Sequence, residues 1–156
     1  MVDDELKLNR KVIEDLFMHA RQGDVSSFLK LHASDAYLVD PVFGCLSGLD
    51  LRSFISKQFT AYRQFDVKHT VLDIGLCSSV VRMAVSAKDE SVQGRAGFEI
   101  NACVITKDGI VLHHEVDFDI ANWARIMLPG VHLYRGILPG WRRHLSARAR
   151  RRFLSA

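Results

Sequence analysis

The chain has few cysteines and no long apolar run, and each of these features excludes a class of protein. Cys45, Cys77 and Cys103 are odd in number and lie at no metal-ligand spacing, which argues against a disulfide framework and a zinc site and favours a reducing compartment. No stretch is long and apolar enough to span a membrane. The acidic start, residues 1–5, lacks the apolar run of a signal peptide. We therefore expect a cytoplasmic protein without a bound metal.

Acidic residues are also missing from one end of the chain, which divides it by charge. Residues 129–156 contain seven arginines and no aspartate or glutamate, a charge of +7. Residues 1–128 contain 14 lysines and arginines and 18 acidic residues, a charge of −4, so that the two parts together give the overall +3. A chain of 156 residues is long enough for one domain with a real core. We predict a globular domain over 1–128 and a basic C-terminal extension over 129–156.

Apolar residues recur at helical spacing in three places in the first half of the chain. They predict a helix over about residues 6–21, a short helix beginning near Val25 and a third helix over about residues 51–62. A strand that ends at Asp40 separates the second helix from the third. Residues 44–48, which contain two glycines, are predicted to form a loop.

The second half of the chain has an apolar period of two, which is typical of strands. A polar turn is predicted at residues 88–94, and the Asp108–Gly109 pair predicts a hairpin turn. Helices followed by an antiparallel meander indicate the α+β class. The predicted strands cover residues 67–74, 79–87, 95–106 and 110–119.

The strand that ends at Asp40 carries the first candidate functional residue. Alternate residues of a strand share a face, so Ala36, Leu38 and Asp40 point to the same side. A carboxylate at the end of an apolar face is costly unless it is paired, solvated or used in chemistry. Pro41 follows directly and favours an extended backbone at Asp40. Two interpretations stay open: Asp40 caps a turn, or it serves a functional site.

His114 on the last strand is the second candidate. Leu112, His114, Val116 and Phe118 share one face of that strand, and this face is apolar except for the histidine. Asp40 and His114 are therefore both expected on inward faces of one sheet. A carboxylate beside an imidazole is a general acid–base arrangement, because the anion fixes the tautomer and raises the imidazole pKa. The alternative is a core histidine whose hydrogen bonds are satisfied.

Taken together, these segments resemble the nuclear transport factor 2-like superfamily, which includes ketosteroid isomerase, SnoaL-like polyketide cyclases, scytalone dehydratase and limonene epoxide hydrolase. The resemblance covers residues 6 to about 128. Its most specific part is the step from Asp40 to Pro41 with Gly44 after it. The remaining parts are the two helices, the run 32–41, the helix led by Gly48 and the meander closed by residues 107–119.

The resemblance implies a cone: a curved antiparallel sheet wrapped by three N-terminal helices around a hydrophobic pocket. Asp40 matches the aspartate that is the general base of ketosteroid isomerase. The oxyanion-hole positions of that enzyme are filled here by Leu16 or Phe17 and by Ala102, so steroid isomerase activity is not expected. Val116 stands where the cyclases have a catalytic aspartate. The pairing of Asp40 with a histidine is similar in kind to scytalone dehydratase.

The basic extension has a pattern of its own. Trp141, Leu145, Ala149 and Phe153 recur every four residues, so a helix there would be amphipathic, with its arginines on other faces. Such a helix fits an anionic lipid, a nucleic acid or an acidic protein surface. We favour docking on an acidic surface, or simple solvation, over nucleic-acid binding. Trp123 is expected to pack the segment that closes the domain.

The sequence leaves two functions open. The one that we favour is a cofactor-free enzyme, a lyase, isomerase, cyclase, dehydratase or hydrolase, that acts on a small apolar oxygenated molecule with Asp40 as general base and His114 as its partner. The other is a non-catalytic ligand-binding or dimeric assembly module, because a fold alone does not decide function. The resemblance also implies a homodimer formed through the sheet. The residues expected to shape the pocket are Leu38, Phe54, Tyr62, Val116 and Phe118.

Overall fold

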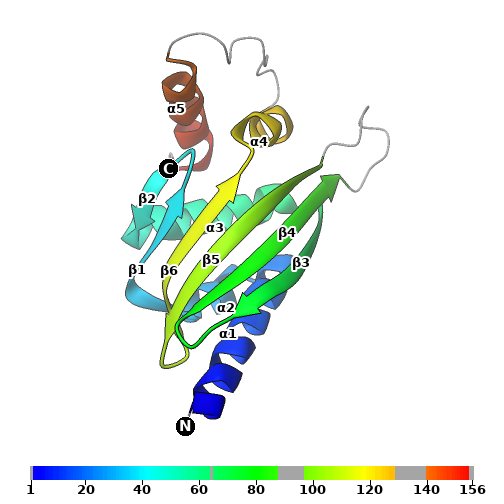
Figure 1. Ribbon diagram of the computed structural model, residues 1–156. Helices are drawn as coiled ribbons and strands as arrows, with labels where there is room; N and C mark the ends of the chain where they lie inside the picture. Colours follow the sequence, from blue (N-terminus) through cyan, green and yellow to red (C-terminus); the bar gives the residue numbers. More distant parts are fainter. Residues whose placement is uncertain (1, 64, 88–96, 129–139, 155–156) are drawn as a thin grey trace.

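A curved six-stranded sheet with helices packed on its inner face forms the frame of the protein (Figure 1). The computed structural model describes residues 2–63, 65–87, 97–128 and 140–154. The helices are α1 (Val2–Gln22), α2 (Val25–Lys30), α3 (Gly48–Tyr62), α4 (Ile120–Met127) and α5 (Trp141–Phe153). The strands are β1 (His32–Asp40), β2 (Gly44–Ser47), β3 (Phe65–Ile74), β4 (Ser78–Ala87), β5 (Gly97–Lys107) and β6 (Ile110–Phe118).

The strand order brings the first and last strands of the domain side by side. The order is β2-β1-β6-β5-β4-β3, in which β1 and β6 run parallel and all other neighbours run antiparallel. Leu38 of β1 pairs with His114 of β6. The α+β class and the antiparallel meander are therefore confirmed. The two candidate residues lie on neighbouring strands, because Asp40 ends β1 and His114 is in the middle of β6.

The predicted strand faces are confirmed by burial. In β1, Ala36, Leu38 and Asp40 are buried, and Tyr37 between them is exposed. In β5, Ala102 is buried and Asn101 is exposed, so Asn101 points away from the core. The alternation follows from the period of two in a strand that has a core on one side and water on the other.

The predicted loop over residues 44–48 is wrong, since Gly44–Ser47 is strand β2. Gly44 has a φ of +76°, a conformation that costs glycine little, and it turns the chain back after Phe43. The four residues of β2 then pair with the end of β1, and Leu46 is buried. Four residues with one buried side chain carry too weak a periodicity to be distinguished from a loop. This hairpin fixes the geometry of the chain around Asp40.

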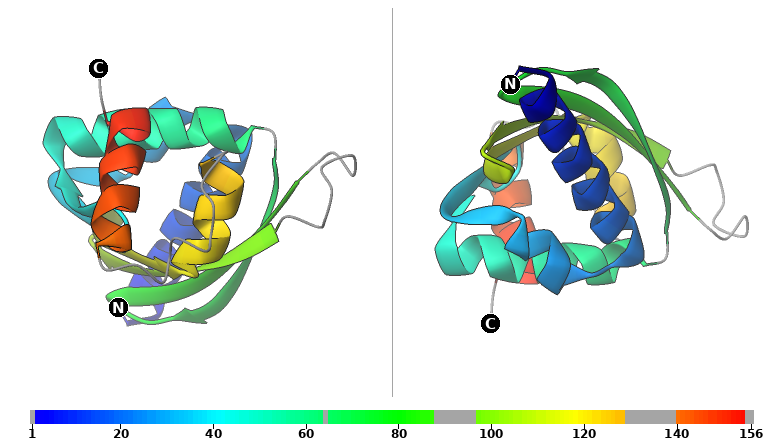
Figure 2. Two further views of the ribbon diagram at one scale, coloured as in Figure 1. Left: turned by 90° about the horizontal axis from the view of Figure 1, so that it is seen from above. Right: turned by 90° about the horizontal axis from the view of Figure 1, so that it is seen from below.

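The N-terminal helices cover the inner face of the sheet, and two further helices lie at one end (Figure 2). Helix α1 is amphipathic and buries Val12, Ile13, Leu16 and Phe17 against the sheet. Seen from above, α3 lies across from the sheet (Figure 2), and Figure 1 shows α4 and α5 at the upper end of the sheet. In the described part of the chain, no helix is long and apolar enough to cross a membrane.

The described part of the basic extension forms helix α5, and an apolar contact holds it on the domain. Leu145, Ala149 and Phe153 are buried, as the spacing of four predicts for one face of a helix. The Phe153 ring lies 5.8 Å from the ring of Phe43. The guanidinium of Arg150 donates a hydrogen bond to the backbone carbonyl of Phe43. The predicted polar turn at 88–94 and residues 129–139 lie outside the described residues.

Candidate functional site

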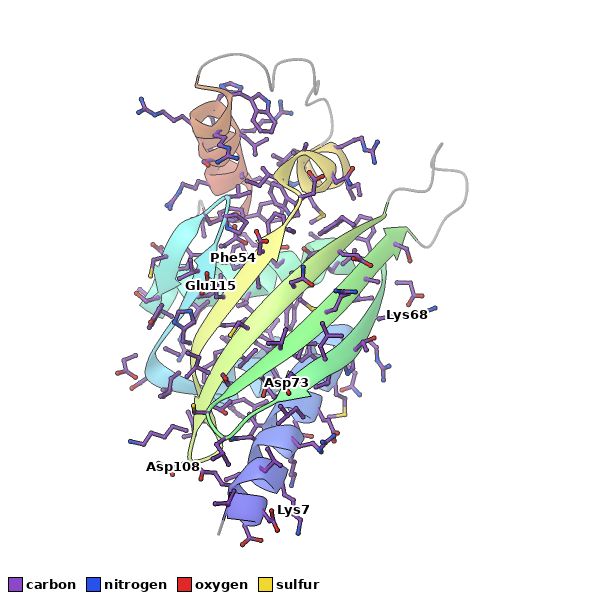
Figure 3. All side chains as sticks on the ribbon, viewed as in Figure 1. Lys7, Phe54, Lys68, Asp73, Asp108 and Glu115 are labelled. Carbon is purple, nitrogen blue, oxygen red and sulfur yellow. The ribbon has the colours of Figure 1, made fainter. Side chains whose placement is uncertain are left out.

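An apolar cavity of about 110 Å³ lies between the inner face of the sheet and the helices. Figure 3 shows the side chains on the two faces of the sheet: Phe54 comes from α3 on the helical side, whereas Glu115 is an exposed residue of β6. All seven residues predicted for the site line this one cavity. They are Leu38, Asp40, Phe54, Tyr62, His114, Val116 and Phe118.

Asp40 is buried at the end of β1 and is held by the turn that follows it. Its exposed fraction is 4%. Its Oδ1 accepts hydrogen bonds from the backbone N–H groups of Val42 at 2.7 Å and Phe43 at 3.0 Å. Burial raises the pKa of Asp40 to about 6, and the two amide hydrogen bonds oppose this rise because they favour the anion. The turn-cap interpretation is thus correct for Oδ1, and it is compatible with a place in the cavity.

Tyr62 lies within the electrostatic reach of Asp40. Burial raises the pKa of the Tyr62 hydroxyl, the negative charge of Asp40 raises it further, and a hydrogen bond with Trp123 opposes the rise. The hydroxyl is buried although the side chain as a whole is half-buried. Tyr62 therefore stays protonated near neutral pH and keeps an O–H that can donate a hydrogen bond inside the cavity.

His114 does not form the expected pair with Asp40. Both ring nitrogens of His114 are buried and have no hydrogen-bond partner in the described part of the chain. Burial, together with the nearby His32 and His113, lowers the pKa of His114 to about 3. The expectation that the carboxylate raises the pKa of this histidine is therefore wrong, because the loss of hydration dominates. His114 is a neutral imidazole near neutral pH.

The register of the strands offsets the two residues along the sheet. Leu38 pairs with His114, so Asp40 lies two residues further along β1. A strand rises about 3.3 Å per residue and neighbouring strands lie about 4.8 Å apart, which separates the two Cα atoms by about 8 Å. Asp40 also turns Oδ1 toward the amides of its own hairpin. The cavity therefore has two polar groups at separate places rather than one hydrogen-bonded dyad.

The His114 ring is surrounded by other rings. Its centroid lies 6.3 Å from that of Phe17 in an edge arrangement and 6.5 Å from that of His32 in a stacked one. His32 is satisfied, since its Nδ1 donates to the carbonyl of Phe28 at 2.9 Å. The sequence had left open that His114 is a core histidine with its hydrogen bonds made. His32 makes such a hydrogen bond, whereas His114 makes none with a described residue.

Sequence reasoning did not assign Gln58 to the site. Gln58 lines the cavity with an exposed fraction of 5%, and its Oε1 has no partner in the described residues. Gln58 lies on the buried face of α3. A polar residue four positions before Tyr62 on that face is the signal that could have marked it, because i and i+4 lie above one another. Trp123, predicted to pack the closing segment, also lines the cavity.

The described residues contain no group of three or more His, Cys, Asp and Glu side chains that could hold a metal ion. Cys45 and Cys77 are exposed, Cys103 is half-buried and all three are unpaired. None of them is among the described residues that line the cavity. The chemistry that the described cavity offers is therefore that of one carboxyl, one phenol, one amide and one neutral imidazole.

No family model matches the sequence, and no curated protein is significantly similar to it. Solved structures do match its fold. The structure of TerC crystallised with polyporic acid aligns with a TM-score of 0.64 at 16% identity, over 77% of this chain and 98% of TerC. An NTF2-like protein from Burkholderia xenovorans LB400 aligns with a TM-score of 0.55 at 14% identity, over 78% and 96% of the two chains.

A third structure is a protein with a ketosteroid isomerase-like fold from Catenulispora acidiphila DSM 44928, in complex with trimethylamine. It aligns with a TM-score of 0.56 at 11% identity, over 74% of this chain and 91% of its own. The chain has the nuclear transport factor 2-like fold. The nuclear transport factor 2-like resemblance drawn from the Asp40–Pro41 step and the meander is confirmed at the level of the fold. Identities this low carry no further assignment.

Proposed function

We propose that the protein is an enzyme that moves a proton on a small, uncharged, mostly apolar and oxygenated molecule, with Asp40 as the general base. The observation that carries the proposal is a buried carboxyl, with a pKa raised to about 6, in the wall of an apolar cavity. A general base works best when its pKa lies near the working pH, because it is then mostly ionised and still a good proton acceptor. Asp40 meets that condition near neutral pH.

The hairpin gives Asp40 a fixed orientation. Oδ1 is bound by two backbone N–H groups, and neither of these two hydrogen bonds uses Oδ2. Oδ2 is thus the oxygen that takes the proton in the proposed reaction. The fixed carboxylate saves the reaction the entropic cost of orienting the base.

Tyr62 is proposed as the donor that stabilises the negative charge left on the substrate oxygen when the proton is removed. Its O–H stays protonated and lies within the field of Asp40. A single donor in a dry site contributes several kcal/mol to such stabilisation. Leu38, Phe54, Val116 and Phe118 are proposed to shape the apolar walls. His114 is proposed to contact the substrate as a neutral donor or acceptor, in place of the acid–base pair expected from the sequence.

Other proteins of this fold support a small-molecule ligand. TerC was crystallised with polyporic acid and the Catenulispora protein with trimethylamine. The cavity of about 110 Å³ is somewhat smaller than a protein cavity of about 150 Å³ that holds benzene. We therefore propose substrates no larger than a six-membered ring.

Exchange of the α-protons of cyclohexanone into D₂O, followed by ¹H NMR, tests the proposal. The wild-type chain is expected to accelerate exchange, with a rate that rises through pH 6 as Asp40 ionises and then levels off. Asp40→Asn keeps an oxygen for the two turn amides but has no basic site, so it should lose the acceleration. Asp35→Asn, on the exposed side of the same strand, is the matched control and should retain it. Equal exchange by wild type and Asp40→Asn would remove Asp40 from the mechanism.

A second candidate function is a non-catalytic ligand-binding or assembly module. It is favoured by the use of Asp40 Oδ1 as a turn cap and by the small size of the cavity. Binding of cyclohexanone without accelerated exchange is the result that this function predicts. A homodimer through the sheet is proposed for either function, and the exposed apolar residues Tyr37, Val80 and Ile105 on the sheet support it. The unpaired cysteines support a reducing compartment.

A further inference from the structure

Two buried polar side chains in the cavity have unused hydrogen-bonding capacity. Gln58 and His114 have exposed fractions of 5% and 4%. Their unpartnered atoms are Gln58 Oε1, His114 Nδ1 and His114 Nε2. Buried polar atoms in folded proteins are nearly always hydrogen-bonded, because an unpartnered one loses its hydration without compensation. Both side chains belong to the wall of one cavity, so a molecule that enters it, with small shifts of the two side chains, is the partner available to them.

We propose that Gln58 and His114 form a subsite that binds a hydroxyl-bearing part of the ligand, separate from Asp40. The inference uses the cavity of the proposed function and names the class of molecule that enters it.

The charge of the cavity excludes an anionic ligand. No lysine or arginine is among the described residues that line it. His114 is a neutral imidazole near neutral pH, because burial disfavours its cationic form. The carboxylate of Asp40 repels a second anion in the same apolar space. A carboxylate or phosphate on the ligand would therefore be buried without a counter-charge, and the ligand of this subsite is uncharged.

The hydrogen-bonding capacity selects a hydroxyl over a carbonyl. A neutral imidazole has one N–H donor and one acceptor nitrogen, and Oε1 of Gln58 is an acceptor only. A carbonyl oxygen accepts only, so it cannot satisfy Oε1. A hydroxyl donates and accepts, so it can satisfy both Oε1 and an imidazole nitrogen without any change in the amide. An alcohol or a phenol is thus the group that fits both side chains.

The surroundings of the subsite fit a ring that carries the hydroxyl. The His114 ring contacts the edge of Phe17, and the rest of the cavity wall is mostly apolar and aromatic. Aromatic rings contact one another favourably in offset or edge arrangements. Phenol has the proposed ring size, and toluene has nearly the same shape with a methyl group in place of the hydroxyl. The two molecules therefore separate the contribution of the hydroxyl from that of the ring.

Titration of the full chain with phenol, toluene and benzoate, followed by NMR with ¹⁵N-labelled histidine rings, tests the subsite. Phenol is expected to bind at least about tenfold more tightly than toluene, because toluene leaves the buried polar atoms unpaired. Benzoate should not bind. Phenol should also shift the ring nitrogens of His114, and toluene should not.

Two variants test whether the preference for phenol comes from Gln58 and His114. Gln58→Met and His114→Leu are each expected to reduce the phenol-to-toluene preference by about threefold or more, because each replaces a polar partner by an apolar side chain of similar length. Ser79→Ala is the matched control: Ser79 is buried and its Oγ lacks a described partner, but it does not line the cavity. The control should leave the preference unchanged. If His114→Leu does not fold, Gln58→Met and the His114 nitrogen shifts in the wild type carry the test.

Equal affinity for phenol and toluene, or binding of neither, would overturn the subsite, since water alone would then satisfy the two side chains. A preference that survives both Gln58→Met and His114→Leu would overturn it as well. The subsite and the proposed function fail separately. If the wild type prefers phenol but does not accelerate exchange, only the proposed reaction is refuted. If it accelerates exchange but does not prefer phenol, only the subsite is refuted.

Discussion

Replacing Asp40 by asparagine is expected to stabilise the protein above pH 6 and to have little effect below pH 4. Burial holds the pKa of Asp40 at about 6 in the folded chain, against 3.8 for the unperturbed carboxyl. The folded state therefore binds the proton more tightly than the unfolded state does. Stability falls as pH rises from 3.8 to 6, where only the unfolded chain has lost its proton, and it stays at the lower level above pH 6.

The size of the effect follows from the two pKa values. One pK unit corresponds to about 1.4 kcal/mol, so the ionised Asp40 lowers the free energy of unfolding by about 3 kcal/mol. Asparagine resembles the protonated acid in shape and keeps an oxygen for the N–H groups of Val42 and Phe43. At pH 8, Asp40→Asn should gain about 3 kcal/mol, which corresponds to a rise of roughly 6–12 °C in the melting temperature of a chain of this size.

Urea denaturation at pH values from 4 to 8 measures this difference, with tryptophan fluorescence as the signal, because Trp123 is buried. The difference between variant and wild type cancels the contributions of the histidines that both proteins share. Asp35→Asn, an exposed position on the same strand, is expected to change stability by less than about 0.5 kcal/mol at every pH. A variant Asp40→Asn that is equally stable or less stable than the wild type at pH 8 would refute the reasoning.

Two more variants test the tail and the histidine. Arg150→Ala removes the hydrogen bond to the Phe43 carbonyl and should lower the free energy of unfolding by about 1–3 kcal/mol. Arg151→Ala, on the exposed side of α5, should change the free energy of unfolding by less than about 0.5 kcal/mol. Equal losses of the two variants in urea denaturation would contradict the role of the Arg150 contact. Because burial holds the pKa of His114 near 3, the wild type should lose about 2 kcal/mol relative to His114→Leu between pH 6.5 and pH 4.5. Parallel pH profiles of the two proteins would contradict this.

The stability cost of Asp40 bears on its function. A carboxyl that only caps a turn gains nothing from burial in an apolar wall, since an exposed aspartate or an asparagine would accept the same two amide hydrogen bonds. The expected loss of about 3 kcal/mol above pH 6 is of the kind that proteins carry at functional sites, where a perturbed pKa serves the chemistry. The same substitution should therefore stabilise the chain and abolish the proposed proton transfer.

Helix α5, the described part of the basic extension, contacts the turn that orients Asp40. The Arg150 guanidinium donates a hydrogen bond to the carbonyl of Phe43. The backbone N–H of Phe43 in turn donates a hydrogen bond to Asp40 Oδ1. Phe153 also packs on the rings of Phe43 and Trp123. The extension thus stabilises the hairpin through an apolar face and one cationic contact. The acidic docking surface expected for its arginines stays a prediction.

Local patterns in the sequence were sufficient for the faces of the strands and for the candidate residues. A period of two placed Asp40 and His114 on inward faces, because side chains in a strand alternate between core and water whatever the partner strand is. A spacing of four likewise identified the stripe of α5 that is buried. These features depend only on the residues within one element, so one sequence is enough to read them.

What the sequence by itself determined is therefore which side chains point inward; which atoms they meet was decided by the tertiary structure. The register of β1 against β6, the hairpin that takes Asp40 Oδ1 and the unpartnered state of Gln58 and His114 all depend on contacts between residues far apart in the chain. The pKa of a buried group follows from those contacts. Burial without a partner made His114 neutral, where the pattern alone had predicted an imidazole made more basic by an adjacent carboxylate.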